Sequence, residues 1–521
     1  MKRGFAWLFL FLLPPLLAAL ALVFLLIDGG VSFTTDSFSY MAIARYFADS
    51  AAYVDYLDIP VALWPPLLPA LLALLHMLGI SDPDVLAALL NPACYLVSLG
   101  SMIWLLGRAM EKQDRRHLPW IAVAVVLLSW PLFKISLWML SEPLFVATVS
   151  VFFVAAFHYH EKQSRGPLLL MGLAAALAVM TRYSGVTVIA TGIVFIALSS
   201  AVLRRKMLHT LLFACLSLLP LLLWLLRNYA QHGRLTGPRL PSTLSLSDAV
   251  VDLFEATLRW YLPGSVMSPS LLDFLLLLFV LGWIWMLRQQ RFRTHAASHI
   301  VVLLAIFVLL FSVFMIATST TVRMDRLGTR LLLPLSLPLS LLLVLWIRWT
   351  LSLLPLHRFL RTGFVVAALL VISYIPYHRL SGMRDYRAEG WTATEWRENA
   401  LLPRAGEILS TRPDAYVLSN LPFVLSWYTD VRVRRSLVVP DGDHADPAAH
   451  ATQLHHFREL LGEGRPVCLV WFNWEGYGNV LPPVRLAHYF ELDTLLAMEE
   501  GYVLELRESQ VGETFPNETM K

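Results

Sequence analysis

The chain has 521 residues, of which 57% are hydrophobic and 15% are charged. Soluble domains carry about 25% charged residues, so this composition excludes an ordinary soluble protein and is typical of a membrane protein. The formal net charge of +4 is too small to indicate nucleic-acid binding. The cysteines, at positions 94, 215 and 468, lack the spacing of a disulfide framework or a thiolate metal site.

Residues 1–27 combine Lys2 and Arg3 with a long apolar run, which predicts a first membrane helix that is not cleaved as a signal peptide. The outer loop that follows, residues 28–83, contains two apolar stretches. Residues 37–49 mix apolar and polar side chains and predict a short amphipathic helix at the membrane interface. Residues 65–80 are apolar but short and interrupted by prolines, so we expect a second interfacial helix that does not cross.

Further apolar runs bring the prediction to about eleven membrane-spanning helices. Lysine and arginine are concentrated in every second connection between the runs, as expected for cytoplasmic loops. This pattern places the N-terminus inside and the C-terminal tail outside, and a crossing at residues 65–80 would invert it throughout. The runs lie at residues 84–107, 118–138, 142–160, 167–182, 184–203, 208–226, 270–287, 297–318, 329–349 and 362–378.

The C-terminal tail is richer in charge and alternates short β-like runs with helical patterns, which predicts a small α/β domain. We therefore expect an all-α transmembrane module at residues 1–380, which includes the loop 28–83, and an extracytoplasmic α/β domain at residues 381–521. The β-like runs are Ala415–Ser419, Val431–Val439 and Pro466–Phe472, and the helical patterns lie around Leu421–Tyr428 and Ala451–Leu461.

Asp36 lies early in the first outer loop. Ionisable side chains at the edge of an apolar bundle are costly and therefore suggest a function. A structural interpretation competes with this, because aspartate is a preferred N-cap and a helix is expected to begin near Ser37. The two roles are compatible, and the sequence leaves both open.

Glu142 lies in the triplet Ser141-Glu142-Pro143, where Pro143 suits the first turn of a helix. A carboxylate in that turn interacts favourably with the helix dipole, so a structural role again competes with a catalytic one. Arg182 and Tyr183 close another helix at the outer face, and the same dipole can explain an arginine at a helix C-terminus.

The outer loop after Arg227 is rich in arginine, glycine and proline. Guanidinium groups match phosphate oxygens bidentately, so Arg227 and Arg239 predict an anion-binding site, with a solvated basic loop as the alternative. Asp325 and Arg330 lie in the segment RMDRLGTR, where Asp325 could instead pair with a neighbouring arginine. Residues 441–446 resemble a metal-binding loop only loosely.

Six short segments and their order along the chain are informative: TTDSFSYMAIARYF, WPPLLPALLALLHMLG, SEPLF, TRYSG, RNYAQHGRLTGPR and RLGTRLLLPLSLP. Together they resemble the glycosyltransferase C (GT-C) superfamily over roughly residues 1–380. The resemblance is strongest to bacterial dolichyl-phosphate-mannose protein mannosyltransferase-like and lipid A aminoarabinose transferase-like enzymes. It implies a multi-pass enzyme of the bacterial inner membrane. Such an enzyme transfers a hexosyl or pentosyl group, with inversion, from a polyprenyl-phosphate carrier to a lipid, glycan or protein acceptor at the outer face.

The resemblance also implies roles for individual residues. Asp36 and Glu142 match the acidic catalytic positions, and they would be the ligands if a divalent metal ion is used. No other cofactor is implied. The implied substrate-binding residues are Tyr40, Arg182, Tyr183, Arg227, Arg239, Asp325 and Arg330.

Two positions depart from the family pattern. Ser37 stands where many relatives have a second acid, and Trp64 stands where many have a lysine that helps to bind the carrier phosphate. Phosphate binding would then depend on Arg227, Arg239 or Arg330. The same two departures keep open a non-catalytic member of the superfamily.

A sugar carried on a lipid phosphate is already activated, which is consistent with a sequence that has no Gly-rich nucleotide-binding motif. A transporter or flippase of lipid-linked glycans is the competing class, and it favours ionisable groups at the membrane midplane and repeated halves. The predicted spans contain few central charges, with Lys134 and Asp273 toward their outer ends, and no repeat is visible.

Overall fold

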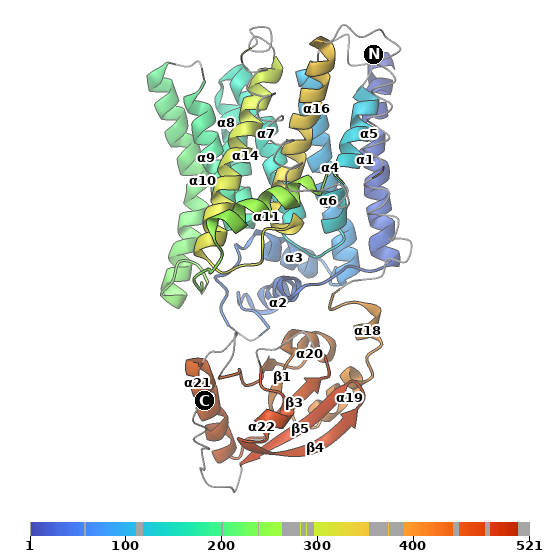
Figure 1. Ribbon diagram of the computed structural model, residues 1–521, viewed down its shortest axis with the longest axis vertical. Coiled ribbons are helices and arrows are strands. Elements are labelled where there is room, and N and C mark those ends of the chain that lie inside the picture. Colours follow the sequence, from blue (N-terminus) through green and yellow to red (C-terminus); the bar gives the residue numbers. More distant parts are fainter. Residues whose placement is uncertain are drawn as a thin grey trace. The chain divides into compact units, whose positions relative to one another are not determined.

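The chain divides into two compact units, one formed by Met1–Ser32 and Pro60–Glu389 and the other by Phe33–Ile59 and Gly390–Lys521 (Figure 1). The second unit thus includes part of the first outer loop. The computed structural model describes residues 2–56, 59–110, 118–199, 202–237, 239–262, 282, 288, 296–353, 374, 390–440, 447–474 and 480–508.

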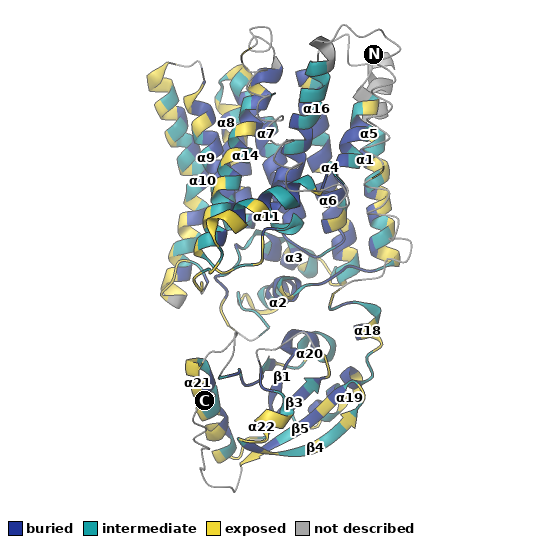
Figure 2. Cartoon of the chain, in the orientation of Figure 1, coloured by how far each residue is buried: buried dark blue, intermediate teal, exposed yellow. Residues whose placement is uncertain are grey.

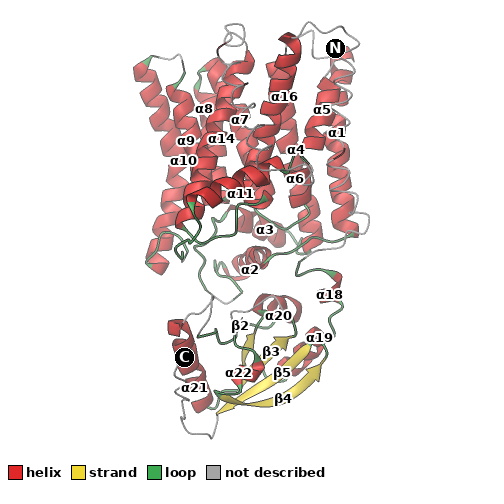
Figure 3. Cartoon of the chain, in the orientation of Figure 1, coloured by secondary structure: helices red, strands yellow, loops and turns green. Residues whose placement is uncertain are grey.

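The first unit consists of helices (Figure 3). The central helix α7 is apolar around its circumference and packs against α8 and α4, and α4 in turn packs against α1. The helices are α1 (Lys2–Asp28), α3 (Leu67–Met77), α4 (Pro83–Ala109), α5 (Leu118–Leu128), α6 (Trp130–Ile135), α7 (Glu142–Lys162), α8 (Arg165–Thr181), η2 (Tyr183–Gly185), α9 (Val186–Ala197), α10 (Leu203–His232), α11 (Leu246–Leu258), α14 (Ala296–Thr321), α15 (Thr329–Leu332), η4 (Leu333–Leu335) and α16 (Ser336–Leu353).

Five helices in the described part of the chain are long and apolar enough to cross a membrane. The predicted runs 270–287 and 362–378 lie outside the described residues except at positions 282 and 374, so the count of about eleven stays a prediction. Helix α3 has 11 residues, or ~16 Å, which is short of the ~30 Å hydrocarbon core. The five are Pro83–Ala109, Glu142–Lys162, Leu203–Gln231, Ala297–Thr321 and Thr329–Thr350.

The predicted continuous run 118–138 is wrong in one respect, because it is broken into α5 and α6. Pro131 lies in the first turn of α6. A proline at this point of an uninterrupted helix would lack one hydrogen bond and clash with the preceding turn, so the chain starts a new helix instead. Burial also differs between helices, since α7 is largely buried and α10 is largely exposed (Figure 2).

The second unit contains a five-stranded sheet in the order β2-β1-β3-β5-β4. β1 pairs in parallel with β2 and β3, and β5 pairs antiparallel with β3 and β4. The predicted α/β domain is confirmed, but the hairpin β4–β5 was not predicted. The elements are α18 (Thr394–Arg397), α19 (Leu401–Ser410), β1 (Tyr416–Ser419), α20 (Pro422–Thr429), β2 (Val433–Arg435), α21 (Pro447–Gly462), β3 (Val467–Phe472), α22 (Pro483–Leu486), β4 (Phe490–Met498) and β5 (Gly501–Glu508).

Helix α2 (Thr35–Ser50) also belongs to the second unit, where it contacts α20. The side chains that predict an interfacial helix are used in this packing. The Phe38 ring lies with its centroid 5.3 Å from that of Phe423 and 5.8 Å from that of Trp427. The loosely metal-like run 441–446 lies outside the described residues.

Candidate active site

Glu142, at the start of α7, is buried and forms the centre of a charged cluster. Its Oε1 forms an ion pair with Nη1 of Arg182 at 2.7 Å and accepts a hydrogen bond from Nε of Arg330 at 2.9 Å. Nη1 of Arg182 also lies 3.0 Å from Oγ of Ser141, to which it donates. Three of the predicted site residues, from distant parts of the sequence, are therefore brought together.

The segment that leads into Glu142 is fixed by a buried amide. Asn91 on α4 is 2% exposed, and its Nδ2 donates to the carbonyl oxygens of Ser136 at 2.8 Å and Trp138 at 3.0 Å. These bonds satisfy carbonyl groups that lie between α6 and α7, where no helix can pair them. Asn91 was not among the predicted residues, and a polar residue inside an apolar run was the only signal for it.

Arg182 is presented at the end of α8 by a tight turn. The chain continues directly into η2, and a β-carbon at Gly185 would lie 2.5 Å from Cα of Val179. Only glycine allows so close an approach of the turn to the last part of α8. The motif TRYSG therefore has a structural basis, since its glycine permits the turn that places the arginine.

The cluster has an excess of positive charge, because two guanidinium groups face one carboxylate. The side chain of Arg182 is 21% exposed and that of Arg330 is 26% exposed. Each guanidinium carries N–H donors in a fixed, planar geometry. Within the described part of the chain, Oε2 of Glu142 is buried without a hydrogen-bond partner. The two guanidinium groups, and not this carboxylate oxygen, suit an anion such as a phosphate.

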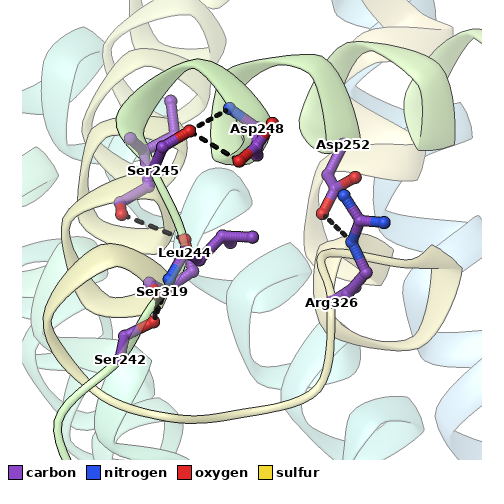
Figure 4. Close-up of polar contacts among 8 residues, drawn as sticks. Ser242, Leu244, Ser245, Asp248, Asp252, Ser319 and Arg326 are labelled. Carbon is purple, nitrogen blue, oxygen red and sulfur yellow. Dashed lines mark hydrogen bonds and ion pairs between the residues drawn. The ribbon is translucent and has the colours of Figure 1, made fainter.

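The segment just before Arg330 is held in place by the chain around α11. Oδ2 of Asp252 on α11 pairs with Nε of Arg326 at 3.0 Å (Figure 4). Nε1 of the buried Trp260 donates to Oγ1 of Thr329 at 3.2 Å. Both contacts therefore hold the residues that immediately precede Arg330. Sequence reasoning missed both partners.

Ser242 adds a further connection in the same region, where its Oγ donates to the carbonyl oxygen of Ser319 at 2.6 Å (Figure 4). The predicted substrate-binding residue Asp325 lies on this loop and is exposed. The expectation that Asp325 pairs with an adjacent arginine is not met at Arg326, which pairs with Asp252 instead.

Tyr183 and Arg227 form a second group, which hydrogen-bonds to the backbone of the segment before α3. The Tyr183 hydroxyl donates to the carbonyl oxygen of Ala62 at 2.8 Å, and Nη1 of Arg227 donates to that of Val61 at 2.7 Å. The Arg227 guanidinium also stacks on the ring of Trp224, at 4.8 Å from its centroid. Both predicted residues thus have structural contacts, and their contact with a substrate stays a prediction.

Arg239 lies within electrostatic range of the Tyr183 hydroxyl, so it belongs to the same neighbourhood. Asn228 was missed by the sequence, although its Nδ2 lies 3.3 Å from that hydroxyl and 3.0 Å from the carbonyl oxygen of Leu235. Its position one residue after Arg227 was the only indication.

Asp36 lies in the first turn of α2 and is half-buried. The interpretation of Asp36 as the N-cap is wrong, because Thr34 is the N-cap. Oγ of Ser37 accepts from the amide of Thr34 at 3.0 Å, and Oγ1 of Thr34 accepts from the amide of Ser37 at 3.4 Å. Ser37, the departure from the family pattern, therefore completes a capping box. Tyr40, on the same helix, is 2% exposed.

A metal ion at Glu142 is not favoured by its surroundings, because two guanidinium groups already neutralise the carboxylate and would repel a cation. Among the described residues, no group of three or more histidine, cysteine, aspartate or glutamate side chains is placed to hold a metal ion.

No protein-family model matches the chain, and no curated protein matches it significantly. Solved structures do match. ArnT from Cupriavidus metallidurans in the apo state has a TM-score of 0.60 at 13% identity, and the comparison covers 96% of this chain and 98% of ArnT. ArnT bound to undecaprenyl phosphate has a TM-score of 0.57 at 13% identity with the same coverage. The chain therefore has the fold of ArnT, as the resemblance in its sequence predicts.

Proposed function

We propose that this protein is a membrane glycosyltransferase that takes a sugar from a polyprenyl-phosphate carrier and transfers it to an acceptor at the outer face of the bacterial inner membrane. The observation that carries the proposal is the cluster of Glu142, Arg182 and Arg330, in which two guanidinium groups face one buried carboxylate. The fold adds support, because a protein with the same fold was solved with undecaprenyl phosphate bound.

In this proposal, Arg182 and Arg330 bind the carrier phosphate. When the bond between the anomeric carbon and the phosphate oxygen breaks, negative charge develops on that oxygen. Guanidinium donors that are already oriented stabilise this charge without reorganisation. We assign Glu142 the role of orienting the two arginines. A carboxylate that is neutralised by two ion pairs is a poor proton acceptor, so Glu142 is not the base.

Asp36 is proposed as the general base. Its carboxylate takes the proton of the acceptor hydroxyl while the hydroxyl oxygen attacks the anomeric carbon. The polyprenyl phosphate leaves from the opposite face, which inverts the configuration. This role comes from the resemblance of TTDSFSY to the family motif, and it gains from the finding that Thr34 already caps α2. General-base catalysis contributes about 10²–10⁴ in rate.

Asp36→Asn and Arg330→Gln separate the two proposed roles. Purified protein in liposomes would be tested with radiolabelled polyprenyl-phosphate sugars and a membrane extract as acceptor. We expect Asp36→Asn to bind undecaprenyl phosphate normally and to lose at least about 100-fold in transfer rate. We expect Arg330→Gln to bind it more weakly, by about tenfold or more, since a charge-assisted hydrogen bond contributes about 1.5–3 kcal/mol.

The exposed Arg234 is a control, and Arg234→Gln should bind and transfer as the wild type does. Full transfer by Asp36→Asn would remove Asp36 from the mechanism. Movement of the labelled lipid across the bilayer without transfer would favour the flippase alternative, and no activity of either kind with any donor would favour a non-catalytic subunit.

A further inference from the structure

We propose that the C-terminal unit has a catalytic purpose, which is to set the rotation of α2 about its axis and thereby the direction in which Asp36 points. This inference rests on the proposed function, because it takes Asp36 as the base. It assigns a task to the outer domain and to two residues, Arg45 and Asp430, that lie outside the proposed reaction centre.

An aromatic cluster holds the N-terminal half of α2 on α20. Phe33 is 0% exposed and Phe38 is 2% exposed. The ring centroid of Phe33 lies 5.3 Å from that of Trp427, and that of Phe38 lies 5.3 Å from that of Phe423. The amide of Trp391 also donates to the carbonyl oxygen of Phe33 at 3.2 Å. Burial of these rings supplies most of the free energy that holds α2 against α20.

An ion pair holds the C-terminal half. Nη1 and Nη2 of Arg45 donate to Oδ1 and Oδ2 of Asp430 at 2.7 and 3.1 Å, which is a bidentate geometry. Asp430 ends α20 with a φ of 58°, a left-handed conformation that glycine, asparagine and aspartate adopt more readily than other residues. The side chains are 53% and 71% exposed, so the pair adds little to stability. A bidentate pair does restrict orientation.

The helical period relates these contacts to Asp36. Phe38 and Arg45 are seven residues apart, so they lie within about 20° of each other around the helix axis. Asp36 lies about 160–180° from both. The face of α2 that docks on α20 is therefore opposite the face that carries Asp36. Two contacts on one face, separated along the helix, prevent α2 from rolling, so the C-terminal unit determines where the carboxylate points.

Charge reversal of the ion pair tests this inference. We expect Arg45→Asp and Asp430→Arg each to lower kcat by about tenfold with the affinity for undecaprenyl phosphate unchanged, because a misdirected base slows chemistry and not donor binding. The double variant restores the attraction with the charges exchanged and should recover most of kcat. The matched control is the exposed pair of Arg507 and Asp493, joined at 2.7 Å between β5 and β4. Reversing that pair should leave kcat unchanged.

Amide hydrogen exchange of residues 35–50 provides a second measurement that does not depend on activity. Exchange should rise in each single variant and fall again in the double variant. If Arg45→Asp fails to fold, Arg45→Gln replaces it. Raised exchange with unchanged kcat would overturn the inference, and so would weaker donor binding in place of a lower kcat. If Asp36→Asn retains full transfer while the pair variants behave as expected, the proposed base is wrong but the positioning of α2 matters for another group on that helix.

Discussion

Replacing Glu142 by glutamine is the most direct test of the charged cluster, because it removes one negative charge and nearly preserves the shape of the side chain. In the native protein the carboxylate is buried, and its Oε1 forms ion pairs with Arg182 at 2.7 Å and Arg330 at 2.9 Å. The substitution leaves two guanidinium groups near each other without a counter-charge.

The expected loss of stability follows from this geometry. Breaking a buried ion pair by removing one partner costs about 3–5 kcal/mol. The side chains of Arg182 and Arg330 are 21% and 26% exposed, so solvent relieves part of their repulsion. We therefore expect E142Q to lose about 3 kcal/mol of unfolding free energy, the low end of that range. Added undecaprenyl phosphate should restore part of it, because the phosphate supplies the missing negative charge.

Thermal unfolding in detergent, with and without undecaprenyl phosphate, measures both effects. Glu255→Gln is the control, because Glu255 is 40% exposed and pairs with Arg259 at the end of the same helix. This substitution should lower the unfolding free energy by less than about 0.5 kcal/mol. The reasoning is refuted if E142Q unfolds at the temperature of the wild type, or if the lipid phosphate stabilises both proteins equally.

Two further predictions concern other parts of the chain. Asp252→Asn breaks the ion pair to Arg326, and a pair of this kind contributes about 0.2–1 kcal/mol, so titration with undecaprenyl phosphate should show up to about fivefold weaker binding. Asp248→Asn on the same helix is its control, and unchanged affinity in Asp252→Asn would separate α11 from the arginine site. Burial raises the pKa of the Cys468 thiol from 9.0 to about 11, so the folded state holds this proton more tightly than the unfolded chain. The contribution of this thiol to the unfolding free energy is complete below pH 9 and is lost as the pH rises through 11. Cys468→Ala should therefore reduce the fall in Tm between pH 9 and pH 11. An unchanged dependence of Tm on pH in this variant would contradict the assignment to Cys468.

Local patterns in the sequence determined the class of the protein and most of its elements. Apolar runs of helical length predicted α4, α7 and α14 within a few residues, and short β-branched runs predicted β1, β2 and β3. These features depend on residues close together in the chain, and hydropathy and periodicity report them directly. The hairpin β4–β5 was missed, although Leu504, Glu505, Leu506 and Arg507 alternate apolar and charged side chains as a half-buried strand does.

Fine backbone geometry was decided only by the structure. The sequence analysis offered only Asp36 as the cap of α2, and the structure shows that Thr34 is the N-cap instead. The break between α5 and α6, with Pro131 in the first turn of α6, was not predicted, because hydropathy averages over such a break. In each case several local solutions have similar energies, and packing chooses among them.

Tertiary structure also decided which of the predicted site residues meet. Glu142 and Arg330 are 188 positions apart in sequence, and no local pattern links them. Their contact depends on how α7, α8 and the segment before α16 pack, as does the assignment of α2 to the same unit as α20. The sequence alone could propose Asp36, Glu142 and the arginines as a set, because charge on apolar elements is costly and therefore visible. The distances between helices determine which arginine neutralises which carboxylate, and only the folded chain defines these distances.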